Sequence, residues 1–223
     1  MENDKTDIFL PSDELSSRLE LNYPWETRVE QLVRERTLVF GRADYDFFHL
    51  KAVANWAKIL GKLEGLEPKE TEILTAAGWL HDIGYDFSGR KDSAKNWEAV
   101  KLQKKVHSQE SARIASEWYQ AEESLRINFS EDDWSAVVAL IKGHEDLDKI
   151  EQGAYQYKLL PYIVAADTLG QIDTRGGVKL SYKGKELRKY LSKPLSRRMK
   201  LMPSSKARAI LITLINNVLR NES

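Results

Sequence analysis

Apolar residues recur at helical spacing along most of this 223-residue chain, and this pattern constrains the fold more than any other feature. Alternation typical of strands occurs only around Val178–Tyr182, after two glycines, and predicts at most one small β-hairpin near residues 176–184. We therefore expect an all-α fold. The helical segments are predicted at about 27–39, 47–63, 68–84, 106–120, 130–141 and 159–169, with a last one from about 204 onward.

The chain is long enough for one substantial core, and it shows no internal repeat, low-complexity run or interdomain linker. We therefore expect a single domain over residues 25–223. Residues 1–24 are mostly acidic and are interpreted as an N-terminal extension of uncertain order. The stretch from Asp92 to Gln103 fits either a short helix or an exposed insert.

The chain contains no cysteine, which excludes disulfides, thiolate metal sites and cysteine nucleophiles. Its 34 basic and 34 acidic residues balance, so no polyanionic partner is implied, and nucleic acid is not expected. We interpret the basic excess after Lys179 as a solvated face. The N-terminus lacks the apolar segment of a signal peptide, and the stretch Ala209–Leu219 is too short to span a bilayer. We expect a cytoplasmic protein without a membrane partner, and the sequence leaves open a homo-oligomer.

Two aspartates change the interpretation of the histidines. A lone histidine beside an apolar helix face is usually a satisfied core residue. Here Asp82 directly follows His81, and Asp167 lies in the apolar run 163–169, where a buried carboxylate is costly unless it meets a cation or several donors. Adjacent residues of a regular helix point about 100° apart. His81 and Asp82 can therefore converge on one ion only if their helix ends there, as Ile83-Gly84 suggests.

The order His49, His81-Asp82, Asp167 resembles the HD superfamily of metal-dependent phosphohydrolases. The matching stretches are 48–54, 79–84 and 165–169, and the resemblance covers roughly 44–177. It implies an HD-type helical bundle in which these four side chains hold one divalent metal.

The two remaining histidines, His107 and His144, follow the longer order of some HD branches. That resemblance implies a second ion held by Asp82, His107 and His144. A single ion, with His107 and His144 contacting the substrate or supporting the ligands, remains open. Imidazole and carboxylate ligands suit Mn, Fe, Co, Ni or Mg. Closed structural zinc sites usually contain cysteine, so such a site is less expected.

The resemblance implies hydrolysis of a phosphomonoester, phosphodiester or phosphoanhydride bond in a small nucleotide-like substrate by a metal-activated water. Asp82 is expected to take part in catalysis as a metal ligand. Asp86 and Glu145 are candidate proton acceptors. Lys104, Lys142 and Arg175 are candidates for neutralising substrate phosphates. Three alternatives remain: a nucleotide-sensing HD module without turnover, a di-iron HD oxygenase and, less expected, nucleic-acid binding through the basic C-terminal third. The run from His81 to Asp86 departs from the signature of the cyclic-di-GMP phosphodiesterase branch, so that activity is not expected. The resemblance does not identify the substrate.

Overall fold

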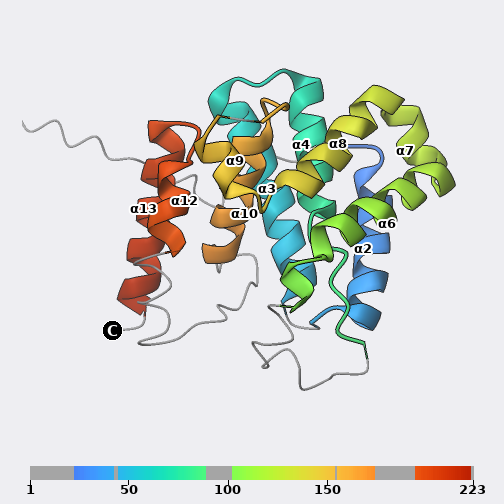
Figure 1. Ribbon diagram of the computed structural model, residues 1–223, viewed down its shortest axis with the longest axis horizontal. Coiled ribbons are helices and arrows are strands. Elements are labelled where there is room, and N and C mark those ends of the chain that lie inside the picture. Colours follow the sequence, from blue (N-terminus) through green and yellow to red (C-terminus); the bar gives the residue numbers. More distant parts are fainter. Residues whose placement is uncertain (1–22, 43–44, 89–101, 154, 174–193, 222–223) are drawn as a thin grey trace, which may run out of the picture.

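The computed structural model describes residues 23–42, 45–88, 102–153, 155–173 and 194–221, and in these ranges the chain forms helices and loops without a strand (Figure 1). The predicted all-α fold is confirmed. None of the helices in the described ranges is long and apolar enough to cross a membrane. The β-hairpin predicted near 176–184 lies outside the described residues, as does most of the stretch 92–103. The helices are α2 (Glu26–Phe40), α3 (Asp46–Glu64), α4 (Pro68–Leu80), α6 (His107–Ala121), α7 (Glu123–Asn128), α8 (Glu131–Gly143), α9 (Leu147–Glu151), α10 (Leu160–Ile172), α12 (Pro194–Lys200) and α13 (Ser205–Asn221).

Local signals account for several helix ends. Ser130 and Asp133 form the predicted capping box of α8, because each side chain accepts a hydrogen bond from the backbone N–H of the other. Pro68 occupies the first turn of α4, as expected, since proline lacks the N–H that would go unbonded there. Helix α4 stops at Leu80, four residues before the predicted end at Gly84. His81 and Asp82 therefore lie in the turn that follows α4.

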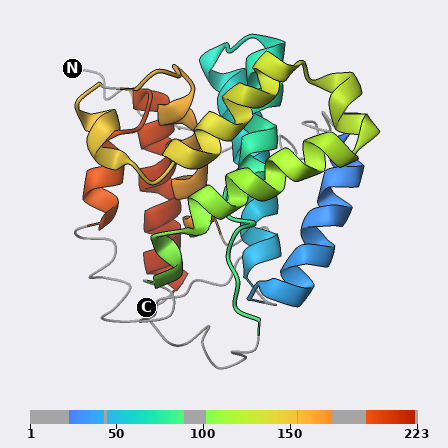
Figure 2. The same cartoon turned by 45° about the vertical axis from the view of Figure 1, so that its right-hand side comes forward.

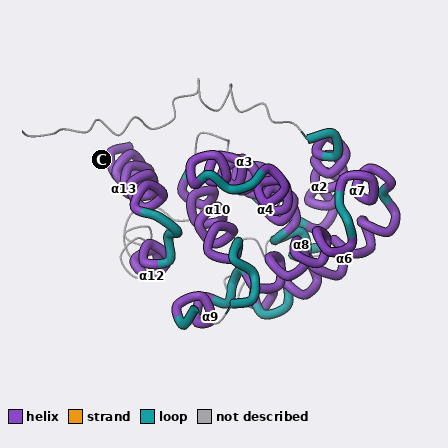
Figure 3. The backbone as a smooth tube through the Cα atoms, turned by 90° about the horizontal axis from the view of Figure 1, so that it is seen from above, coloured by secondary structure: helices purple, strands orange, loops and turns teal. Residues whose placement is uncertain are grey.

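Helices α3, α4 and α10 pack against one another at the centre of the molecule (Figure 3). Two glycines allow this close approach. A Cβ atom at Gly78 of α4 would lie 3.0 Å from the Ala54 Cα, and one at Gly170 of α10 would lie 3.1 Å from the Val53 backbone nitrogen. His49, His81 and Asp167 each lie about one helical turn from these contacts along their own chain segments. The close packing of small residues thus sets the register that brings the three side chains together.

Helices α6 and α8 pack against each other and cross in front of α3 and α4 (Figure 2). The amino end of α6 and the carboxyl end of α8 reach the region where α4 ends. His107 is the first residue of α6, and His144 directly follows α8. Both histidines therefore come to the same place as His81.

Candidate metal centre

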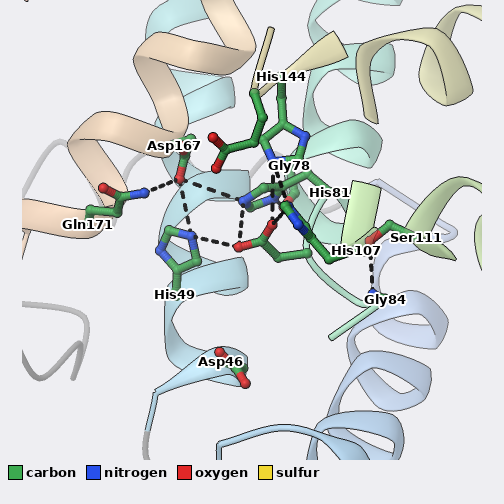
Figure 4. Close-up of polar contacts among 12 residues, drawn as sticks. Asp46, His49, Gly78, His81, Gly84, His107, Ser111, His144, Asp167 and Gln171 are labelled. Atoms are coloured by element: carbon green, nitrogen blue, oxygen red, sulfur yellow. Dashed lines mark hydrogen bonds and ion pairs between the residues drawn. The ribbon is translucent and has the colours of Figure 1, made fainter. Parts of the chain in front are cut away.

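Six side chains from five parts of the fold converge on one small volume (Figure 4). The four histidines and Asp167 are buried, and Asp82 is partly exposed. The set joins α3, the turn after α4, the start of α6, the end of α8 and the middle of α10. Its members are His49, His81, Asp82, His107, His144 and Asp167.

The Asp82 carboxylate divides its two oxygens between two pairs of histidines. Its Oδ1 lies 3.1 Å from His107 Nε2 and 3.4 Å from His144 Nε2. Its Oδ2 lies 3.6 Å from His81 Nε2 and 3.7 Å from His49 Nε2. Each oxygen and its pair of imidazoles have ligand atoms within 4.8 Å of one another, so each group could hold a metal ion. Asp82 belongs to both groups.

Asp167 lies beside the group formed by His49, His81 and Asp82 Oδ2. Its Oδ1 lies 3.2 Å from His49 Nε2 and 3.7 Å from His81 Nε2. The same oxygen accepts a hydrogen bond of 2.9 Å from Gln171 Nε2, one turn further along α10. Its Oδ2 accepts a hydrogen bond of 2.5 Å from the guanidinium of Arg198. The Arg198 contact therefore leaves Oδ1 as the oxygen that faces the histidines.

Backbone carbonyls determine which nitrogen of three imidazoles faces the cluster. The Nδ1 atoms of His81, His107 and His144 lie 3.0, 3.1 and 2.7 Å from the carbonyl oxygen three residues earlier in the chain. Because a carbonyl only accepts hydrogen bonds, each Nδ1 carries a proton and donates it. A neutral ring then presents the lone pair of Nε2 to the cluster, as metal-binding histidines do.

The facing lone pairs require a proton or a cation. The Nε2 atoms of His107 and His144 lie 3.3 Å apart and share Asp82 Oδ1 as a neighbour. Within the described residues, His81 Nε2 and Asp82 Oδ1 are buried and lack a well-aligned hydrogen-bond partner. Buried acceptors that face one another are unfavourable unless something positive lies between them. These residues therefore fit a divalent cation.

Comparison with known families agrees with this geometry. The family model of the HD domain matches residues 47–188, more than half of the chain. The chain belongs to the HD-domain superfamily of metal-dependent phosphohydrolases. The resemblance seen in the sequence is thereby confirmed, and all six cluster residues fall within the matched part of the HD domain. Searches of curated proteins and of solved structures found no match.

Neighbouring charges shift the pKa values of His81 and of both aspartates in the HD centre. Burial alone would lower the pKa of His81, but the carboxylates of Asp82 and Asp167 outweigh it and raise this pKa to about 9. Burial would likewise raise the pKa of both aspartates. The charges of His81 and His107 instead hold the pKa of Asp82 well below its ordinary value, and Arg198 and the histidines do the same for Asp167. A metal ion must displace the proton of His81 in order to bind at Nε2.

The other residues predicted from sequence lie in different surroundings. Asp86 is exposed and accepts hydrogen bonds from the backbone N–H and the hydroxyl of Ser88, so it closes a surface turn. Lys142 is exposed on α8. Glu145, next to His144, is partly exposed, and its Oε1 lies 3.7 Å from Lys104 Nζ. Arg175 lies outside the described residues.

Arg198 was missed by the sequence interpretation, which placed it on a solvated basic face. It is buried, and besides Asp167 its guanidinium contacts Thr168 and lies 3.7 Å from Glu145 Oε1. Arg198 lies beyond the matched HD segment, on α12. No sequence pattern links it to Asp167, whereas Gln171 could have been found because residues four apart share a helix face.

Proposed function

We propose that this HD domain is a metal-dependent hydrolase that cleaves a phosphomonoester, phosphodiester or phosphoanhydride bond of a small nucleotide-like substrate. The observation that carries the proposal is the division of the Asp82 oxygens between two histidine pairs. A single carboxylate that faces two groups of imidazole lone pairs is the arrangement expected for a ligand shared by two cations. Family membership supports the reaction type, since HD domains are mostly metal-dependent hydrolases.

The proposed ligand sets follow from these distances. The first ion takes His49, His81, Asp82 and Asp167, and the second takes Asp82, His107 and His144. Nitrogen and carboxylate donors without thiolates favour Mn, Fe, Co, Ni or Mg. The first set has the larger negative charge because it contains two carboxylates, so we expect it to bind its ion more tightly.

The protein groups around the ions have distinct proposed roles. When bound, divalent ions supply Lewis acidity to a phosphoryl oxygen and activate water near neutral pH. The backbone carbonyls hold three imidazoles in the orientation that ligation needs. Arg198 neutralises the Asp167 oxygen that faces away from the cluster. Glu145, a partly exposed carboxylate one residue from His144, is our candidate for accepting the proton of the attacking water, and Lys104 lies beside it.

The test combines metal analysis with a turnover screen. The purified protein is loaded separately with each candidate ion and assayed on bis(p-nitrophenyl) phosphate, p-nitrophenyl phosphate and a panel of nucleotides and dinucleotides. We expect phosphate release that depends on the added ion and is lost in the His81→Ala and Asp82→Ala variants. Normal metal content and full activity in both variants would contradict the ligand assignment.

Two other outcomes would replace the proposal. Metal-dependent nucleotide binding without turnover of any substrate would indicate a sensing module. Iron-dependent oxygen consumption with an oxidised product would indicate an oxygenase. Both outcomes leave the metal centre in place and overturn only the reaction type.

A further inference from the structure

Tyr85 lies directly against the metal centre, although the metal ligands do not include it. Its ring stacks on the His107 imidazole at 4.4 Å with an interplanar angle of 4°, and also on the Phe87 ring at 5.5 Å. The side chain is buried, and its hydroxyl has no hydrogen-bond partner among the described residues. A phenol keeps its proton at neutral pH and can donate it to an acceptor. Tyr85 is therefore a rigidly held, neutral hydrogen-bond donor.

Arg42 is a second neighbour of Tyr85. Its guanidinium carbon is 4.5 Å from the centroid of the Tyr45 ring and 5.4 Å from that of Tyr85. The Tyr45 ring in turn stacks on the His49 imidazole at 5.4 Å. Because one tyrosine ring separates the guanidinium from each imidazole, Arg42 lies within about 10 Å of both His49 and His107. It therefore flanks both halves of the centre.

A buried aspartate fixes the Arg42 side chain in place. Asp46 accepts hydrogen bonds from the Arg42 backbone N–H at 2.6 Å, from Nε at 2.9 Å and from Nη2 at 2.5 Å. The remaining nitrogen, Nη1, has no hydrogen-bond partner among the described residues. The Arg42 side chain is only 17% exposed and is bonded to Asp46 at two of its nitrogens, so Nη1 has little freedom to move. An ordered donor of this kind binds a ligand at a smaller entropic cost than a free surface side chain.

Arg42 Nη1 and the Tyr85 hydroxyl suit the same kind of ligand. A guanidinium N–H and a neutral phenol O–H both bind the oxygens of an anion, and arginine is particularly suited to phosphate. The neighbouring acceptor, Asp46, is already occupied by Arg42. Arg42 and Tyr85 therefore offer donors to a ligand that extends from the metal centre.

We propose that Arg42 and Tyr85 form an anion subsite that binds a second phosphate group of the substrate, beyond the one at the metal ions. The protein is then expected to prefer substrates with two or more linked phosphates over monophosphates. The inference rests on the proposed function, because the first phosphate is placed at the metal centre.

The experiment compares two non-hydrolysable probes, methylenediphosphonate and methylphosphonate, by calorimetry on protein with a fixed excess of Mn²⁺. We expect the unaltered protein to bind the diphosphonate more tightly. Tyr85→Phe keeps the stacked ring and removes only the hydroxyl, so it should weaken diphosphonate binding by several-fold. Arg42→Gln should weaken it by about tenfold or more, because a hydrogen bond to a charged group is lost. Methylphosphonate binding should change less than about twofold in either variant.

Two further variants control the comparison. Arg42→Gln leaves the Asp46 carboxylate buried without its cation, so the double variant Arg42→Gln/Asp46→Asn is measured beside it. The matched control is Arg34→Gln, because the Arg34 guanidinium also lies over an aromatic ring, that of Phe47 at 4.0 Å, but its side chain is 56% exposed and pairs with Glu30. This control should bind both probes like the unaltered protein.

The outcomes separate the two proposals. If Tyr85→Phe and both Arg42 variants bind the diphosphonate normally, or lose both probes equally, the subsite is wrong even when the protein hydrolyses phosphate esters. Failure of the unaltered protein to distinguish the probes would overturn it as well. If the variants selectively lose the diphosphonate and no substrate is turned over, the subsite stands and the proposed hydrolysis fails.

Discussion

Among the buried clusters of charged side chains in the described residues, two differ in whether their polar atoms are satisfied. In the first, Glu26 of α2 contacts Lys58 of α3, with Nζ 2.5 Å from Oε1 and 2.6 Å from Oε2. Trp79 Nε1 and the backbone N–H of Tyr23 also donate to Glu26. Both carboxylate oxygens thus have donors, and the cluster is complete without a ligand.

The metal centre is the opposite case. Its imidazole nitrogens face carboxylate oxygens and each other, and within the described residues three of its buried polar atoms lack a well-aligned partner. The comparison teaches that burial of charge alone does not indicate function. Acceptors that converge without a donor indicate a missing cation, whereas a complete network indicates a structural role.

The largest effect is expected for Asp82→Ala, which removes the ligand shared by both proposed ions. Metal content should fall for both sites, and turnover should fall by about a hundredfold to a thousandfold or more. The metal-free protein should remain folded, because Asp82 is partly exposed. Elemental analysis, turnover and circular dichroism check these results, and a variant that retains both ions would refute the bridging role.

The Glu26–Lys58 cluster should affect stability and leave metal binding unchanged. Lys58→Met leaves Glu26 buried without its cation, so the free energy of unfolding should fall by about 3 kcal/mol or more. Metal content per folded molecule should not change. Urea unfolding of the metal-free protein measures the first quantity and elemental analysis the second. Because Lys58→Met/Glu26→Gln removes both charges, it should recover part of the loss; no recovery would argue against the charge pair as the cause.

Arg198 and Arg197 provide a matched pair on α12. Arg198→Gln leaves the Oδ2 of Asp167 without its donor, and the metal-free protein should lose about 3 kcal/mol of unfolding free energy. Arg197 pairs with Asp148 and Glu151 at the exposed surface, so Arg197→Gln should have little effect. Urea unfolding of both variants, with and without metal, checks the contrast. Equal losses of unfolding free energy would mean that the Arg198–Asp167 contact stabilises the fold no more than the exposed Arg197 pairs do.

The smallest predicted effect is a pH dependence of metal affinity. Since His81 has a raised pKa of about 9 in the metal-free site, an ion competes with its proton below that pH. Affinity should rise by up to about tenfold per pH unit between pH 7 and 9 and then level off. The stability that this raised pKa contributes to the metal-free protein is fully present below about 6.5 and is lost as the pH rises through about 9. Titration in metal-buffered solutions measures the affinity, and a flat profile would contradict the assignment of His81.

The sequence by itself was enough for the helical fold class and for the family. Both depend on local information, namely the spacing of apolar residues and the order of the histidines and aspartates. It also indicated that His81 and Asp82 can converge only where their helix ends, and it placed that end at Ile83-Gly84. The helix ends earlier, at Leu80, so both residues lie in the turn that follows it.

Only the tertiary structure decided how the site is arranged. The division of the Asp82 oxygens depends on where α6 and α8 cross α4, and the Arg198–Asp167 contact joins residues 31 positions apart. Lysines and arginines occur throughout the chain, so their identity does not show which of them is buried. Arg198 and Arg42 were therefore found by packing, and Asp86 and Lys142, plausible by their sequence neighbours, were found on the exposed surface.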